Sequence, residues 1–131
     1  NSLDDLKTTD GVVAVCKEDV PCGTIAHQEL KKHDITLKNA TTESKVTDVA
    51  TKVTTGNADA GFIYTTDLAA AKKKGANLGS IELTDVERNE YPVALSKTGS
   101  SSETAKKFNE WLKNSDEAKK ILTEYGFSTA K

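Results

Sequence analysis

The sequence predicts an α/β fold: a lobe of βαβ units with a largely parallel sheet, followed by two C-terminal helices. Three observations support this prediction. Short apolar runs alternate with amphipathic helical segments, which is typical of parallel strands joined by crossover helices. The first apolar run is β-branched and lacks alternation, as in a strand covered on both faces. The end of the chain, after a Ser-rich stretch, carries helical periodicity alone.

The first strand is predicted over residues 11–16, and the charged residues that follow end it. The Pro-Cys-Gly turn at residues 21–23 then begins the first helix. The apolar side of this helix consists of Ile25, Ala26 and Leu30. A strand followed by a helix of this kind is the first half of a βαβ unit.

A second helix is indicated by apolar residues at i, i+3, i+4 and i+7, and Gly56 follows as its C-terminal stop. These apolar residues are Val46, Val49, Ala50 and Val53. A second strand is predicted over residues 60–64. An Ala/Lys-rich helix is predicted over residues 68–74, where Gly75 ends it.

Two further strands are predicted over residues 81–83 and 91–95, the first of them weak in pattern. From residue 97 the composition changes to a linker-like Ser-rich stretch. We therefore divide the chain into a lobe over residues 1–95 and a hinge with C-terminal helices over residues 96–131.

Two helices are predicted after the Ser-rich stretch. Ser102 offers an N-cap to the first of them, and Ser115 offers one to the second, which Gly126 ends. Their apolar stripes are Ala105, Phe108 and Leu112 on the first, and Ala118, Ile121, Leu122 and Tyr125 on the second. Both stripes need a surface to cover.

Length and charge limit the classes of function. A chain of 131 residues favours one compact domain that can bury a core. With 18 Lys and Arg against 20 Asp and Glu, the net charge of −2 disfavours a nucleic-acid module or a protein adsorbed to anionic lipid. No apolar run approaches the length of about 18 residues that a membrane span needs. The chain has no Met, which we expect of a processed or excised polypeptide.

The sequence does not predict an enzyme. His27 and His33 are six residues apart on one helix and fall on different faces, so we expect exposed side chains rather than a metal pair. Asp59 and Asp67 flank a strand, where loop or capping roles are expected. Phosphate-binding loops and dinucleotide fingerprints are missing from the sequence, so no cofactor is expected. No metal is expected either, because the two histidines do not form a metal pair.

The cysteines carry more information. Cys16 ends the first strand and Cys22 opens the helix after five intervening residues, so the two could meet. The spacing is longer than that of a CxxC redox pair, and two cysteines are too few ligands for structural zinc. We favour a structural disulfide, which implies an oxidising compartment. The alternative is two unrelated buried thiols.

Helix starts and a tyrosine suggest an anion site. The turn at Cys22 and the start of the next helix at Val46 would present backbone N–H groups without partners and a partial positive charge. Tyr64, at the carboxyl end of a strand, could add a hydroxyl donor. All three would lie beyond the strand ends, where α/β sheets bind ligands. The alternative is that these amides bind only water.

Several segments occur in the order seen in one protein family. They are Val-Pro-Cys-Gly at 20–23, the helix at 46–53, TGNADAGFIYTTD at 55–67, Tyr-Pro-Val-Ala at 91–94 and Tyr-Gly-Phe at 125–127. With these segments the chain resembles the periplasmic molybdate- or tungstate-binding proteins of ABC importers, which are type II solute-binding proteins. The resemblance covers almost the whole chain.

The resemblance implies a two-lobed clamshell that holds a tetrahedral oxyanion, molybdate or tungstate, by hydrogen bonds alone. The ligand contacts carried over by position are the backbone N–H groups of Cys22 and Val46 and the hydroxyl of Tyr64. It further implies an extracytoplasmic location, in the periplasm or on a cell-surface lipoprotein. The ligand would be delivered to an ABC permease in the membrane, and the protein would not be an enzyme.

The chain is shorter than the family, whose members have a first lobe before this start. Residues 1–95 look like the second, oxyanion-binding lobe, and the helices within 96–131 look like those that pack on the first lobe. We therefore expect the partner of these helices to be the missing N-terminal lobe or a second copy of the chain, or the helices to fold back onto the sheet. The alternative functions are a ligand-sensing effector domain of a transcription regulator and, last in rank, a thiol-redox enzyme.

Overall fold

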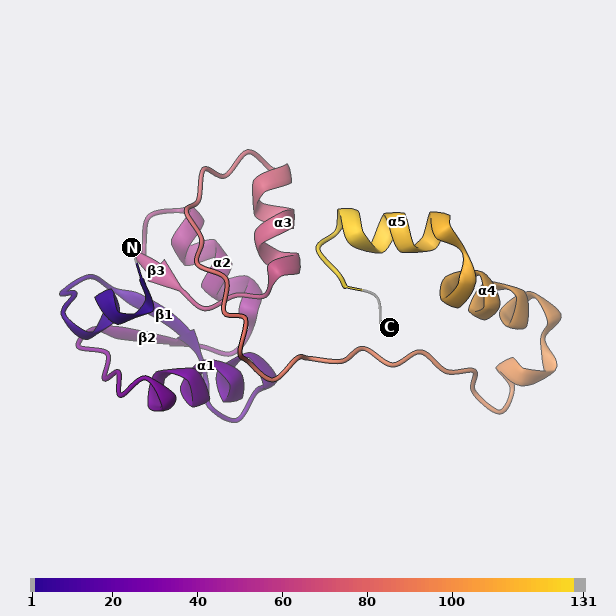
Figure 1. Ribbon diagram of the computed structural model, residues 1–131, viewed down its shortest axis with the longest axis horizontal. Coiled ribbons are helices and arrows are strands. Elements are labelled where there is room, and N and C mark those ends of the chain that lie inside the picture. The colour runs from indigo at the N-terminus through magenta and orange to yellow at the C-terminus, as the bar shows by residue number, and fades with distance from the viewer. Residues whose placement is uncertain (1, 129–131) are drawn as a thin grey trace. The chain divides into compact units, whose positions relative to one another are not determined.

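The computed structural model describes residues 2–128 (Figure 1). The chain divides into two compact units, of which the first ends at Arg88 and the second begins at Asn89. The sequence analysis places this division after residue 95. Residues 89–95 thus belong to the second unit, together with the C-terminal helices.

The first unit is built on a three-stranded parallel sheet with the order β2-β1-β3. The central strand β1 (Val13–Cys16) pairs with β2 (Ala40–Glu43) on one side and with β3 (Ala60–Gly61) on the other. All four residues of β1 are buried, as predicted for a strand covered on both faces. The α/β class with a small parallel sheet is therefore confirmed.

Helices α1 (Pro21–Lys32) and α2 (Val46–Thr54) pack on the sheet, and α3 (Thr65–Lys73) packs against α2. A short 3-10 helix, η1 (Leu3–Lys7), precedes β1. Ala14 and Cys16 of β1 pack with Val49 of α2. Because successive strand residues point to opposite faces, the buried Val13 and Val15 point to the other face, on which α1 lies (Figure 1).

The strands differ most from the sequence prediction. No strand is predicted at β2, whose residues are mostly polar and alternate between exposed and half-buried. Its position depends on backbone pairing with β1. β3 is two residues long, where a strand over 60–64 is predicted. The predicted strands over 81–83 and 91–95 are wrong, since the chain there is irregular and pairs with no strand of residues 2–128.

The helix ends follow the glycine signals in the sequence. Gly56, Gly75 and Gly126 directly follow the C-caps of α2, α3 and α5, each with positive φ, as predicted. The end of α1 has no glycine, and Asp34 takes the left-handed conformation there, with φ 52°. Aspartate tolerates this region better than most residues with a Cβ atom.

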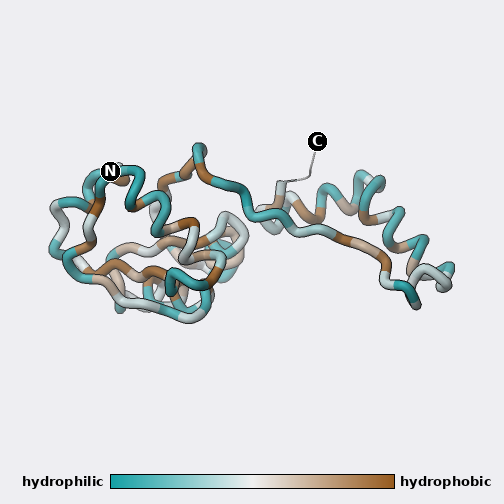
Figure 2. Tube along the Cα trace, turned by 90° about the horizontal axis from the view of Figure 1, so that it is seen from below, coloured by the Kyte–Doolittle hydropathy of each residue, from teal (hydrophilic) through white to brown (hydrophobic). Residues whose placement is uncertain are grey.

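The second unit contains η2 (Gly99–Ser101), α4 (Glu103–Asn114) and α5 (Asp116–Glu124). The predicted caps are confirmed: the Ser102 hydroxyl oxygen accepts from the Ala105 N–H, and the Ser115 hydroxyl oxygen accepts from the first-turn amides of α5. Polar and apolar segments alternate along both helices (Figure 2).

The predicted stripes of the second unit are only partly covered. Ala118 is buried, whereas Phe108, Ile121 and Tyr125 are exposed. The Phe108 ring stacks on Trp111 of the same helix, with ring centroids 5.8 Å apart. None of the helices within residues 2–128 is both long and apolar enough to cross a membrane.

Candidate functional site

The carboxyl ends of the three strands lie at one edge of the sheet, because all three strands run parallel. Helices α1, α2 and α3 each begin just after this edge. Their first amides therefore lie where open α/β sheets hold ligands. Cys22 is the second residue of α1, Val46 is the first residue of α2, and Tyr64 is the N-cap of α3. The structure thus places all three predicted residues at this edge.

The helices at this edge begin without side-chain caps. The N-cap residues of α1, α2 and α3 are Val20, Lys45 and Tyr64, and none of them caps its helix through a side-chain hydrogen bond. In the second unit, by contrast, Ser102 and Ser115 cap α4 and α5. A capping side chain normally satisfies one of the first amides of a helix. In the sequence, the signal for uncapped helix starts at this edge is that Val20 and Lys45 stand where Ser, Thr, Asp or Asn would normally cap a helix.

The first turn of α1 leaves one amide open. Pro21 has no N–H group, and the N–H groups of Gly23 and Thr24 both donate to the Val20 carbonyl at 2.9 Å. Within residues 2–128 the N–H of Cys22 donates to no acceptor. Because a helix N-terminus carries a partial positive charge, this donor suits an anion.

The first turn of α2 leaves two amides open. The Lys45 carbonyl accepts from the N–H groups of Asp48, at 3.1 Å, and Val49, at 3.4 Å. The N–H groups of Val46 and Thr47 have no acceptor in the described part of the chain. Val46 is predicted from the sequence, whereas Thr47 is not, although the absence of a capping residue at Lys45 is a signal for it.

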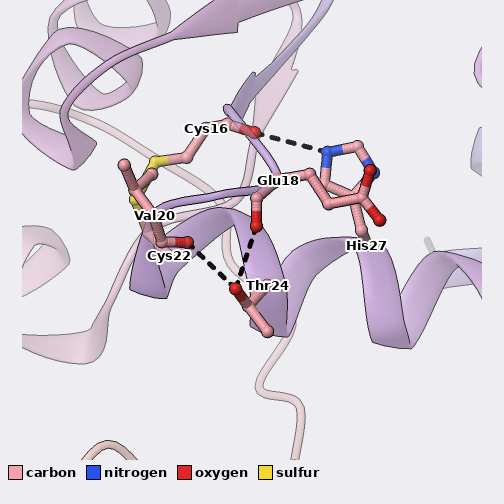
Figure 3. Close-up of a disulfide and its surroundings, with 6 residues drawn as sticks. All are labelled: Cys16, Glu18, Val20, Cys22, Thr24 and His27. Atoms are coloured by element: carbon pink, nitrogen blue, oxygen red, sulfur yellow. Dashed lines mark hydrogen bonds between the residues drawn. A yellow bond between two sulfur atoms is a disulfide. The ribbon is translucent and has the colours of Figure 1, made fainter.

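The turn before α1 is closed covalently. Cys16 and Cys22 form a disulfide with their Cα atoms 5.8 Å apart (Figure 3), so the structure contains the bonded pair rather than two separate thiols. The backbone is also closely packed here, since a Cβ atom on Gly23 would lie 1.7 Å from the Lys17 carbonyl oxygen. Only glycine fits at that position.

Side chains of α1 hold the same turn from the other side. The Thr24 hydroxyl donates to the carbonyl oxygens of Glu18, at 2.9 Å, and Val20, at 3.3 Å (Figure 3). A ring nitrogen of His27 lies 3.3 Å from the Cys16 carbonyl oxygen. The loop that leads to the open amide of α1 is therefore joined at its two ends by the disulfide and held between them by hydrogen bonds to the Glu18 and Val20 carbonyls.

Packing joins the two helix starts. The side chains of Cys22 and Val46 both pack against the buried cluster that contains Ala14, Cys16 and Val49. Ile63, directly before Tyr64, packs against the same cluster. A rigid base of this kind fixes the donors relative to one another before any ligand arrives.

Two carboxyl groups near the edge, those of Glu43 and Asp67, have pKa values shifted in opposite directions. Glu43, at the end of β2, pairs with Lys52, and this hydrogen-bonded partner lowers the pKa of the Glu43 carboxyl below its ordinary value. Asp67, in the first turn of α3, has a buried Oδ2 without a hydrogen-bond partner. Burial raises the pKa of the Asp67 carboxyl above its ordinary value, although backbone hydrogen bonds act in the opposite direction.

The other predicted polar residues have local partners. Asp59 accepts the Val12 N–H at 2.7 Å, which confirms its loop role. His27 and His33 are half-buried rather than exposed, so that expectation is wrong: His27 packs near Cys16, and His33 lies 3.7 Å from Glu29. Among residues 2–128 no three His, Cys, Asp or Glu side chains gather as metal ligands.

Two hollows lie on the first unit. The larger, of about 420 Å³, lies between α2 and α3 and includes Thr47, Thr51 and Asp67. The smaller, of about 280 Å³, includes Glu29 and Asp85. Neither hollow is lined by the three donor residues named in the sequence analysis.

Replacing Asp67 with asparagine should change the pH dependence of stability. A carboxyl whose folded pKa is raised destabilises the fold increasingly as the pH rises from about 4 through that pKa, and the loss then stays constant. Asp67→Asn should therefore gain stability over the wild type across this interval, by less than about 1 kcal/mol because the side chain partly contacts water. Urea unfolding at several pH values measures the difference, and a difference that does not vary with pH would contradict the prediction.

The comparisons with known proteins point in one direction. The sequence profile of the family described as bacterial extracellular solute-binding protein matches residues 1–128. Proteins named molybdate-binding protein ModA from Mycobacterium bovis and Mycobacterium tuberculosis are each 33% identical over 116 residues, which cover 88% of this chain and 44% of the relative. A Bacillus subtilis protein that bears the name of an ABC transporter substrate-binding lipoprotein, YvgL, is 30% identical over 136 residues. The match covers 97% of this chain and 49% of the relative.

The chain spans about half the length of the curated relatives it matches. No solved structure matches the chain. The edge described above therefore corresponds to part of a longer relative, and its open amides lie within the matched region.

Proposed function

The chain belongs to the bacterial extracellular solute-binding proteins, and from this membership we propose that it forms the anion-binding half of an ABC importer's receptor. The proposed ligand is a tetrahedral oxyanion, molybdate or tungstate, in keeping with the names of the mycobacterial relatives. The proposed site of action is outside the cytoplasm, where the receptor delivers its ligand to a membrane permease. In this role the protein binds and releases its ligand without chemical change.

One observation carries this proposal: the open amides of Cys22 and Val46, on two helices without side-chain caps, at one edge of the sheet. Both helix starts offer neutral N–H donors with a partial positive charge. Hydroxyl oxygens that would compete for these donors are absent from the N-caps of α1 and α2, which are Val20 and Lys45.

The donor set favours an oxyanion over other ligands. Molybdate and tungstate carry four oxygen atoms that only accept hydrogen bonds at neutral pH, so backbone amides and the Tyr64 hydroxyl are suitable partners. Neutral donors fixed on a rigid sheet need little reorganisation on binding. A cavity closed around the ligand would then separate the larger oxyanions from sulfate by size.

The described edge supplies half of such a site. The chain spans about half the length of the relatives it matches. We propose that a second lobe, supplied by a preceding N-terminal segment or by another copy of the chain, closes over the ligand. Phe108, Ile121 and Tyr125 of the second unit are exposed, and we propose that these side chains contact that lobe.

Calorimetric titration tests the proposal. The receptor, that is, this chain together with the completing lobe, should bind molybdate and tungstate and bind sulfate far more weakly. In ¹⁵N-labelled protein the backbone resonances of Cys22, Val46 and Thr47 should shift on addition of molybdate. Absence of both heat and resonance shifts with either oxyanion would refute the proposed function.

Replacing Tyr64 with phenylalanine should weaken oxyanion binding. The ring stays in place while one hydrogen bond to a charged acceptor is lost, which corresponds to about 1–3 kcal/mol of binding free energy. Tyr91→Phe is the matched control, because the Tyr91 side chain is exposed and its hydroxyl accepts from Asn89. Equal affinity of the wild type and Tyr64→Phe would remove Tyr64 from the site.

A further inference from the structure

Thr24 lies in the first turn of α1, two residues after Cys22. Its hydroxyl donates to the Val20 carbonyl oxygen at 3.3 Å, the back-bond to the residue four positions earlier that helical threonines often make. The same hydroxyl lies closer, at 2.9 Å, to the carbonyl oxygen of Glu18, which precedes the helix. The Thr24 side chain therefore holds two carbonyl oxygens of the turn (Figure 3). The N–H of Cys22 itself donates to no acceptor within residues 2–128.

The Val20 carbonyl determines how α1 begins. It accepts three donors, the N–H groups of Gly23 and Thr24 and the Thr24 hydroxyl. This carbonyl belongs to the peptide bond that leads into Pro21, whose ring fixes φ near −65°. With the carbonyl held, φ of Pro21 fixed by its ring and ψ of Pro21 set by its position as the first helical residue, the direction of the Cys22 N–H follows.

The orientation of the Glu18 carbonyl affects the electrostatic potential at the proposed anion site. Carbonyl oxygens carry partial negative charge, so an acceptor of the β1–α1 loop that turned toward the donor edge would repel an anion. The Thr24 hydroxyl donates to this oxygen and so restrains the Glu18 peptide group. The disulfide joins only the two ends of the loop, Cys16 and Cys22, and does not reach the peptide groups between them.

We propose that Thr24 is a positioning residue for oxyanion binding: its hydroxyl holds the β1–α1 loop so that the Cys22 N–H points at the ligand. This inference rests on the proposed function. Loss of the hydroxyl removes one hydrogen bond that aligns a donor, and the dissociation constant for molybdate should rise about three- to tenfold.

The experiment compares three variants of the receptor by calorimetric titration with sodium molybdate. Thr24→Val keeps the β-branched shape without the hydroxyl, and Thr24→Ser keeps the hydroxyl without the methyl group. Thr54→Val is the matched control, since the Thr54 hydroxyl also donates to two carbonyls, those of Ala50 and Thr51, but at the far end of α2. Thermal unfolding of each variant without ligand reports the effect on stability alone.

The expected result is weaker binding by Thr24→Val, restored affinity in Thr24→Ser, and wild-type affinity in Thr54→Val despite a similar loss of stability. Should Thr24→Val fold poorly, Thr24→Ala replaces it, because alanine favours the helix. Wild-type affinity in the variants without the hydroxyl, or no recovery in Thr24→Ser, would overturn the inference while the proposed function stands. A wild-type receptor that binds neither molybdate nor tungstate refutes the proposed function itself, and the inference with it.

Discussion

Replacing Gly23 with alanine should disrupt the β1–α1 turn and lower the free energy of unfolding by about 3 kcal/mol or more. A Cβ atom at this position would lie 1.7 Å from the Lys17 carbonyl oxygen and 2.9 Å from that of Cys16. Both contacts are with backbone, so no side-chain rotation relieves them. Alanine is otherwise the better helix former by about 1 kcal/mol, which makes a loss of stability all the more diagnostic of the clash.

Chemical denaturation measures this effect, with Gly79→Ala as the matched control. A Cβ atom on Gly79 would meet nothing within 4 Å, and its φ lies outside the left-handed region, so the same substitution should leave stability nearly unchanged. Because Gly23 adjoins Cys22, the Gly23 variant should also lose oxyanion binding. Equal stability of the two alanine variants would show that the helix start does not pack against β1 as described.

Loss of the disulfide should lower the free energy of unfolding by about 2–3 kcal/mol. The bond between Cys16 and Cys22 closes a loop with five intervening residues, and in the chain-entropy account it acts mainly by restricting the unfolded chain. The double variant Cys16→Ala, Cys22→Ala should therefore unfold at lower denaturant concentration than the oxidised wild type. Cys16 is fully buried, so its replacement also removes packing in the core.

Treatment with a reductant distinguishes the contribution of the disulfide to stability from that of side-chain packing. The wild type should lose stability when dithiothreitol opens the disulfide, whereas the double variant should be indifferent to dithiothreitol. Alkylation under denaturing conditions supplies an independent test, because thiols held in a disulfide react only after reduction. Ready alkylation of both cysteines without reductant would contradict the bond.

Helix ends can be predicted from neighbouring residues, whereas strand pairing cannot. Serine caps at Ser102 and Ser115 and glycine stops at Gly56, Gly75 and Gly126 were all predictable, because each depends on a few neighbouring backbone groups. Strands depend on partners that are distant in sequence. β2 is polar and carries no period-2 apolar signal, yet it pairs with β1 along its whole length, whereas the apolar stretch over 91–95 remains unpaired among the described residues.

The candidate site was predictable in part for the same reason. The positions of Cys22 and Val46 at helix starts, and of Tyr64 beyond a strand, follow from chain order and parallel strands. The helix after Tyr64 begins at Thr65, three residues earlier than the predicted range of 68–74. The open amide of Thr47 and the hydrogen bonds of Thr24 do not follow from chain order, since they depend on which carbonyl each group meets after the turn has folded. Their contributions to oxyanion binding stay predictions until the titrations above are made.

The sequence by itself determined the α/β class, the buried central strand, the serine caps of α4 and α5, the glycine stops after α2, α3 and α5, and the family. These properties follow from local pattern and from residues read in order. Only the tertiary structure decided which segments pair as strands, where the chain divides into units, and which carbonyls the Thr24 hydroxyl holds. The physical reason is that a backbone hydrogen bond needs a partner brought close by the whole fold, and residues far apart along the chain supply that partner.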